Sequence, residues 1–301
     1  MRGSRLERHY ALAGYFMMTP ALLVIALVTL FPIGYSVWMS LNTISSTFHG
    51  FQFTFSGLKN YQIVFTNGLF YQTLEFTTMY AAVTVVVELA LGLLVALALN
   101  QPIRGRGLAV AVMLVPWTLI TVISAQMWAY IYNGVYGVLN YLLVSLHIIQ
   151  NPILWLGSPV LATVSMMVAD IWKTTPFVTM ILLAGLQLIP SELYEAAKID
   201  GASPWTAFWN VTFPLLRPSI GLAALFRILQ AFGLFDLPFV LTGGGPGTST
   251  MSIAMLAYQA IFNLGNFGPG TAVAVTAVAL VIILALVSLK VLRTQVGDVE
   301  S

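Results

Sequence analysis

The sequence contains no cysteine and very little charge. Asp, Glu, Lys and Arg make up 7% of its 301 residues, whereas hydrophobic residues make up 59%. The absence of Cys excludes a disulfide framework, thiolate chemistry and cysteine-ligated metals. A soluble domain carries about 25% charged residues. A chain with so little charge cannot cover itself with a polar surface, so the composition predicts a polytopic membrane protein in contact with lipid.

Other absences narrow the function. No Gly-Lys dipeptide occurs, so the chain has no P-loop of its own, and the glycine-rich run at 243–247 is expected to be a flexible outer connector. The three histidines, His9, His49 and His147, are far apart in the sequence, so no metal site is expected. The sequence shows no recognisable acid–base cluster of the kind that an enzyme would need, so an enzyme is not expected. The net charge of +2 says little about partners, and a nucleic-acid partner is not expected.

Long apolar runs predict six transmembrane helices. A span needs about twenty apolar residues, and proline is tolerated inside membrane helices. Residues 251–262 are apolar but too short to cross, which predicts an interfacial or re-entrant helix. Arg2, Arg5 and Arg8 precede an apolar run long enough to remain in the bilayer, so an uncleaved first span is expected rather than a signal peptide. The predicted spans are 10–41, 73–99, 108–132, 159–189, 218–241 and 271–291.

The placement of Lys and Arg predicts the orientation. Cytoplasmic loops carry an excess of these residues, and six spans place both termini on one side. The opposite side carries Lys59 alone. Both termini and the loop at 190–218 are therefore predicted to be cytoplasmic. The basic residues on the predicted cytoplasmic side are Arg2, Arg5, Arg8, Arg104, Arg106, Lys198, Arg217, Lys290 and Arg293.

The loop at 190–218 has the clearest local pattern in the chain. Ser191 is predicted to cap a first helix, and Gly201 stands where a left-handed residue would end that helix. Ser203 is predicted to cap a second helix with Pro204 at its first position. That second helix is expected to end near Thr212, before two prolines at 214 and 218.

Five ionisable residues fall inside predicted spans, where charge is costly and marks a pathway or an ion pair. Asp170 and Lys173 are three apart on one helix face and can pair with each other, or they can line a solute pathway. Arg227 and Asp236 should point to opposite faces unless the helix breaks between them, and Gly233 and Pro238 make a break possible. For Glu88, structural pairing is favoured over solute contact.

The patterned loop resembles the EAA loop of ABC-importer permeases. Glu195-Ala196-Ala197 is followed by Gly201 at the family's spacing, and residues 211–214, Val-Thr-Phe-Pro, correspond to the family's I-x-L-P. Residues 32–36, 58–61, 172–177 and 241–246 are also similar to the maltose, trehalose and glycerol-3-phosphate permease group. The resemblance covers nearly the whole chain.

This resemblance implies an all-α membrane protein with six transmembrane helices in the MetI-like permease fold. One permease domain would span 1–301, with an N-terminal span and outer loop at 1–72 and a core at 73–293. The chain would be a non-enzymatic subunit without catalytic residues. ATP and Mg would be bound by two partner ATPase subunits, and a second permease subunit and an extracytoplasmic solute-binding protein or lipoprotein would complete the importer.

The resemblance also implies two sets of site residues. The solute would be a sugar, with a disaccharide such as trehalose or maltose favoured over glycerol-3-phosphate or another small solute. An ion-coupled secondary transporter is the alternative from another class, with Glu88, Asp170 and Asp236 as ion relays. The implied substrate-binding residues are Asp170, Lys173, Thr174, Phe177, Arg227, Gln230, Ala231 and Leu234. The implied ATPase-coupling residues are Tyr194, Glu195, Ala196, Ala197, Asp200, Gly201, Ala202 and Pro214.

Overall fold

The computed structural model describes residues 5–48, 50–102 and 104–297. The chain divides into two compact units, Met1–Asn67 with Ala257–Thr276, and Gly68–Leu256 with Ala277–Ser301. Each unit is described by itself. Arg2 of the predicted cytoplasmic set lies outside the described residues, and the side chains of Arg5, Arg8 and Arg293 are not described.

The first unit contains the N-terminal span and a β-hairpin. An apolar helix covers Gly14–Ser40, and none of its most apolar stretch is buried. The two-stranded antiparallel sheet that follows was not predicted, although Phe-Gln-Phe-Thr-Phe at 51–55 alternates with the period of a strand. The elements are α1 (Arg5–Ile25), η1 (Ala26–Leu30), α2 (Phe31–Ser40), β1 (Asn42–Thr47), β2 (Gly50–Phe55), α3 (Lys59–Thr66), η3 (Gln259–Asn263) and the start of α14 (Phe267–Gly297).

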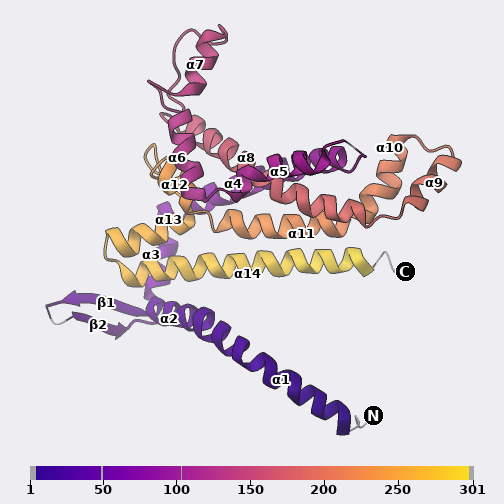
Figure 1. The fold of residues 1–301 in the computed structure, drawn as a ribbon. Coiled ribbons are helices and arrows are strands. Elements are labelled where there is room, and N and C mark those ends of the chain that lie inside the picture. Colours follow the sequence, from indigo (N-terminus) through magenta and orange to yellow (C-terminus); the bar gives the residue numbers. More distant parts are fainter. Residues whose placement is uncertain (1–4, 49, 103, 298–301) are drawn as a thin grey trace. The chain divides into compact units, whose positions relative to one another are not determined.

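The second unit is built around three long helices, α4 (Gly68–Leu99), α8 (Pro159–Gln187) and α11 (Phe213–Phe232), which pack together (Figure 1). Glycine allows the close approach: a Cβ added at Gly92 would lie 2.7 Å from Val178 Cγ1, and one at Gly185 would lie 2.2 Å from Ser219 Oγ. The shorter helices are α5 (Arg106–Thr118), α6 (Thr121–Ile131), α7 (Val138–Ser145), α9 (Ser191–Ile199), α10 (Pro204–Ala207), α12 (Asp236–Leu241) and α13 (Ile253–Tyr258), which continues into η3.

Apolar clusters lie toward both ends of the α4–α8 pair. One contains Tyr80 and Met166, and the other contains Ala96 and Leu182, all fully buried. The stretch of α4 and α8 between these clusters carries buried polar side chains, among them Glu88 and Thr174. The two apolar clusters therefore enclose a polar layer, and this layer contains the candidate site.

The predicted third span is not one straight helix. The segment consists of α5 and α6, which meet at an angle of 91°. Pro116 lies in the last turn of α5, where it removes a backbone donor, and Leu119 and Ile120 are extended. Among the described residues, five helices are long and apolar enough to cross a membrane, and the sixth span exists if the bent pair is counted as one. The short helix predicted at 251–262 is present as Ile253–Asn263, and its first residues are buried.

The predicted end of the helix near Thr212 is wrong. From Pro204 the chain is helical to Phe232, through a π-helical turn, η2 (Phe208–Thr212), and through both prolines. In η2 the Phe213 N–H donates to Phe208 O, five residues back, so the hydrogen-bond register of the helix shifts directly before Pro214. The fifth span therefore ends earlier than predicted, at Phe232, and a break at 233–235 separates it from α12.

Candidate functional site

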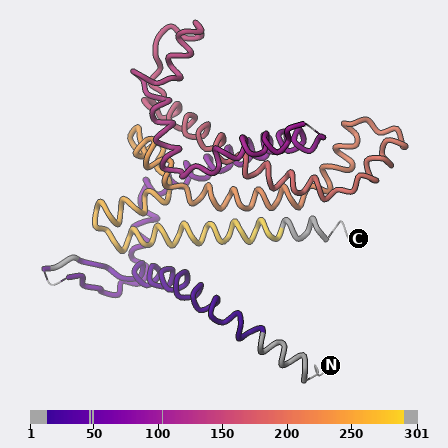
Figure 2. Tube along the Cα trace, in the orientation of Figure 1, coloured from indigo at the N-terminus to yellow at the C-terminus, as the bar shows by residue number. Residues whose placement is uncertain are grey.

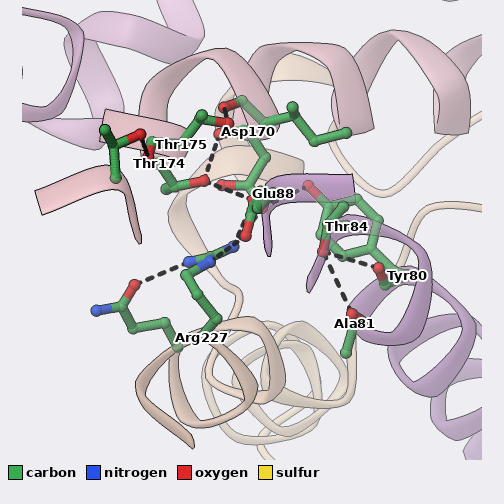
Figure 3. Close-up of polar contacts among 11 residues, drawn as sticks. Tyr80, Ala81, Thr84, Glu88, Asp170, Thr174, Thr175 and Arg227 are labelled. Carbon is green, nitrogen blue, oxygen red and sulfur yellow. Dashed lines mark hydrogen bonds and ion pairs between the residues drawn. The ribbon is translucent and has the colours of Figure 1, made fainter. Parts of the chain in front are cut away.

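Three buried charges from three helices meet in the polar layer (Figure 3). Arg227 of α11 forms a fork onto Glu88 of α4: its Nε donates to Glu88 Oε2, and its Nη2 donates to Glu88 Oε1 at 2.9 Å. The same Nη2 donates to Asp170 Oδ2 of α8 at 3.2 Å. Glu88 is 0% exposed and Arg227 is 2% exposed. This charge triad links the three central helices.

The Arg227 guanidinium alone does not satisfy both carboxylates, Glu88 and Asp170. Hydroxyl groups beside them supply further hydrogen-bond donors. Tyr80 Oη donates to Asp170 Oδ2 at 3.1 Å, and Thr174 Oγ1 lies 2.5 Å from Glu88 Oε1. Arg227 Nη1 also donates to Gln230 Oε1 at 2.8 Å. Buried charges are tolerated only when they are paired and hydrogen-bonded, and every member of the triad meets this condition.

The pairing expected from the sequence is only partly correct. Structural pairing of Glu88 is confirmed by its ion pair with Arg227. The possible ion pair between Asp170 and Lys173 is not formed, because Asp170 points into the core toward Arg227 and Tyr80. Lys173 takes part in neither of the two ion pairs found in the described part of the chain.

A polar cavity of about 280 Å³ opens beside the triad. The break after Phe232 turns Asp236 toward the same cavity as Arg227, an arrangement that the sequence allowed only if the helix broke. Seven of the eight implied substrate residues line it, and Phe177 does not; its ring stacks on Trp117 at 5.7 Å. The lining residues are Trp117, Thr121, Asp170, Lys173, Thr174, Arg227, Gln230, Ala231, Gly233, Leu234, Phe235, Asp236 and Leu237.

The sequence did not single out Trp117 and Thr121 as lining residues. They flank the break between α5 and α6, and only the packing of these helices on α8 and α12 brings them to the cavity. A tryptophan and a threonine beside Pro116 were the available local signal. Asp236 was recognised as an intramembrane charge, but its place at the site depended on the break.

The loop between α8 and α11 folds back as two short helices (Figure 2). Gly201 has φ +77°, as predicted, and the turn is closed by Ala202 N–H to Ala197 O at 2.9 Å and Gly201 N–H to Lys198 O at 3.1 Å. These are the two bonds of a Schellman motif. Ser203 caps α10 through its Oγ, which accepts from Thr206 N–H at 3.2 Å.

The cap predicted at Ser191 is not present. Pro190 occupies the cap position, α9 begins at Ser191, and no side chain caps its N-terminus. Tyr194 Oη lies 3.0 Å from Thr212 Oγ1, which ties α9 to η2. This cross-link and the Schellman turn therefore set the direction of α9 without an N-terminal cap.

Seven of the eight implied coupling residues, all except Pro214, form two groups. Glu195, Ala196, Asp200 and Gly201 are exposed. Tyr194, Ala197 and Ala202 face a groove of about 750 Å³, which also contains Leu97, Asn100 and Gln101 near the end of α4. The exposed group is thus available to another protein, and the inner group faces the transmembrane core.

The fold and the site define a membrane-spanning transport subunit, with a polar cavity enclosed by helices and a structured loop at one end. The sequence matches the family described as binding-protein-dependent transport system inner membrane component over residues 88–296. The chain belongs to this family. It is a permease component of an ABC importer, located in the membrane, and not an enzyme.

Several characterised relatives are similar over almost their whole length. The chain is 42% identical to the trehalose/maltose transport system permease protein MalF of Thermococcus litoralis, covering 96% of this chain and 97% of the relative. It is 36% identical to the trehalose transport system permease protein SugA of Mycobacterium tuberculosis, and the match covers 96% of this chain and 90% of SugA. It is also 36% identical to the sulfoquinovosyl glycerol transport system permease protein SmoG of Agrobacterium fabrum, and the match covers 94% of this chain and 91% of SmoG.

Solved structures show the same fold. A chain from a bacterial ABC transporter that imports alginate has a TM-score of 0.80 and 19% identity, with 96% of this chain and 97% of that chain covered. A chain of the methionine ABC transporter MetNI has a TM-score of 0.54 and 17% identity, with 79% of this chain and 98% of that chain covered. The predicted MetI-like permease fold is thereby confirmed.

Proposed function

We propose that this permease carries a disaccharide of the trehalose or maltose type through the cavity beside the charge triad. The observation that carries the proposal is the cavity lining, which combines hydrogen-bonding groups with aromatic rings. Lys173, Gln230 and Asp236 can bind hydroxyls, and Trp117 and Phe235 can pack against a sugar ring. Two relatives, a trehalose/maltose transport system permease and a trehalose transport system permease, support the same solute class.

The charge triad favours a neutral sugar over a phosphorylated solute. A phosphate would need free cationic groups, and Arg227 is occupied by Glu88 and Asp170. Lys173 remains, but Asp236 lines the same cavity and offsets its charge. Glycerol-3-phosphate therefore fits less well than a disaccharide. The family membership disfavours an ion-coupled secondary transporter.

The cavity volume supports a second permease subunit. Ligand pockets hold about 300–1,000 Å³ and enclose most of the ligand. The cavity in this single chain is about 280 Å³ and is partly open, so a second subunit would complete its wall.

The complex would also contain an extracytoplasmic solute-binding protein, and the termini and the 190–218 loop would lie in the cytoplasm.

The energy for transport would come from two ATPase subunits, which bind ATP and Mg, because this chain has no P-loop sequence. The exposed residues Glu195, Ala196 and Asp200 would contact the ATPase. The inner residues Tyr194, Ala197 and Ala202 would transmit its movement to α4 and η2. Pro214, at the start of α11, would continue that path into the span.

Reconstitution tests this proposal. Liposomes containing this chain, its permease partner and the ATPase, supplied with binding protein and internal ATP, are expected to take up labelled trehalose or maltose. Uptake should be abolished by vanadate and unchanged by an ionophore, and liposomes without the ATPase serve as the control. Uptake by this chain alone that an ionophore collapses, or transport of glycerol-3-phosphate without any disaccharide, would refute the proposal.

Lys173→Met tests the cavity itself. Loss of a hydrogen bond to a charged group costs about 1.5–3 kcal/mol, so the solute concentration for half-maximal uptake should rise about ten- to a hundredfold. Assembly should be normal, because Lys173 is in neither described ion pair. Lys290→Met, a lysine outside the cavity lining, is the matched control. An unchanged concentration dependence for Lys173→Met would remove this lysine from the solute site.

A further inference from the structure

The hairpin β1–β2 has one aromatic face and one polar face. Phe51, Phe53 and Phe55 alternate along β2 and therefore point to the same side. Ile44 is the partner of Phe53 across the sheet and shares that side. Gln52 and Thr54 point to the opposite side. All six residues of β2 are exposed, and Phe55 is 75% exposed; Phe51 is 54% exposed, and its ring also meets the Phe267 ring of α14 at 5.1 Å.

The aromatic face continues an exposed aromatic row on α2. Phe31, Tyr35 and Trp38 lie on one face of that helix at i, i+4 and i+7, with ring centroids 6.2 and 5.5 Å apart. The Trp38 ring then meets the Phe53 ring at 5.0 Å. All three α2 rings are exposed in a span of which none of the most apolar stretch is buried. In a membrane protein such a helix surface faces lipid or another subunit, and the row leads from it onto the hairpin.

Hydrogen bonds fix the base of the hairpin at the end of the span. Asn60 Nδ2 donates to Ser40 O at 2.8 Å and to Asn42 O at 2.9 Å, and Asn60 is buried. Ser56 N–H donates to Leu41 O at 2.9 Å. The hairpin therefore begins where the apolar helix stops.

We propose that this hairpin is a membrane anchor that lies flat in the lipid headgroup region, with its aromatic face toward the acyl chains. Residues 42–58 contain no Asp, Glu, Lys or Arg, so nothing charged opposes this position. Amphipathic aromatic surfaces favour the membrane–water interface. Six strand residues extend about 20 Å, whereas the headgroup layer is about 5–8 Å thick on each side. A flat hairpin keeps its three phenylalanines at one depth, and an upright one would raise them into water.

Single-cysteine labelling tests the anchor, since the chain has no native cysteine. Phe51→Cys and Phe55→Cys report on the aromatic face, and Gln52→Cys and Thr54→Cys are matched controls on the polar face of the same strand. Each full-length variant carries a polarity-sensitive fluorophore in lipid nanodiscs. Labels at 51 and 55 are expected to show blue-shifted emission and equal quenching by lipids that carry a nitroxide. Labels at 52 and 54 are expected to be quenched by aqueous iodide.

Other patterns would overturn the proposal. Iodide quenching of all four labels, or lipid quenching that falls from 55 to 51, would mean that the hairpin projects into water. A third result would identify the aromatic face as a protein-docking surface. In that case iodide quenches the labels at 51 and 55 in the permease alone, and adding the binding protein or the second permease shields them. Sugar uptake by each labelled complex checks that the variant is folded, and a variant without uptake is replaced by Ile44→Cys, which lies on the same face in β1.

Discussion

Arg227→Ala is expected to prevent the permease from accumulating as a folded membrane protein. The substitution leaves Glu88, which is 0% exposed, and Asp170, which is 8% exposed, without their shared counterion. Removing one partner of a buried ion pair costs about 3–5 kcal/mol. A native protein is stable by only about 5–15 kcal/mol, so this loss is a large part of the total. The measurements are the yield of monodisperse protein in detergent and its thermal unfolding midpoint.

Two further variants separate charge from packing. Lys173→Ala, at the same cavity but outside the triad, should leave the yield and the unfolding midpoint close to those of the wild type. Combining Arg227→Gln with Glu88→Gln removes one charge of each sign and should cost less stability than Arg227→Ala alone, because coupled residues are not additive. If Arg227→Ala is as stable as Lys173→Ala, the triad does not hold the helices together.

The triad also shows where sequence reasoning stops. Hydropathy located the spans and identified Glu88, Asp170 and Arg227 as costly charges inside them. Their partners depend on how distant helices pack, since Glu88 and Arg227 are 139 positions apart. The local rule for residues three apart allowed Asp170 to pair with Lys173, but the buried position of Asp170 gave it a tertiary partner, Arg227.

Predictions that rest on local backbone chemistry succeeded more often. The left-handed turn at Gly201 and the cap at Ser203 depend only on neighbouring residues, and both are present. The prolines were misread because a π-helical turn lets the chain pass through Pro214, and helical membrane segments tolerate Pro218. The break after Phe232 contains no residue with positive φ. The sequence offered only Gly233 and Pro238 as hints of the break, so the complete cavity lining required the structure.

Gly201→Val is expected to uncouple transport from ATP hydrolysis. The residue has φ +77°, where a β-branched side chain is strained, and nothing lies within 4 Å of an added Cβ. The penalty therefore comes from the backbone alone and amounts to about 1–2 kcal/mol. The nine-residue α9 has few anchors besides this turn and Tyr194, so the turn should open and displace Glu195 and its exposed neighbours.

A penalty of that size lowers the ratio of closed to open turn by about 5- to 30-fold, and sugar uptake by the reconstituted importer should fall by up to the same factor. Membrane insertion should be unaffected. Gly201→Asn should retain most of the uptake, because asparagine tolerates the left-handed conformation. Gly265→Val places the same strain at φ +68° outside the loop and should leave coupling intact. Normal uptake by Gly201→Val, or equal losses at both glycines, would show that the Gly201 turn does not control docking of the ATPase.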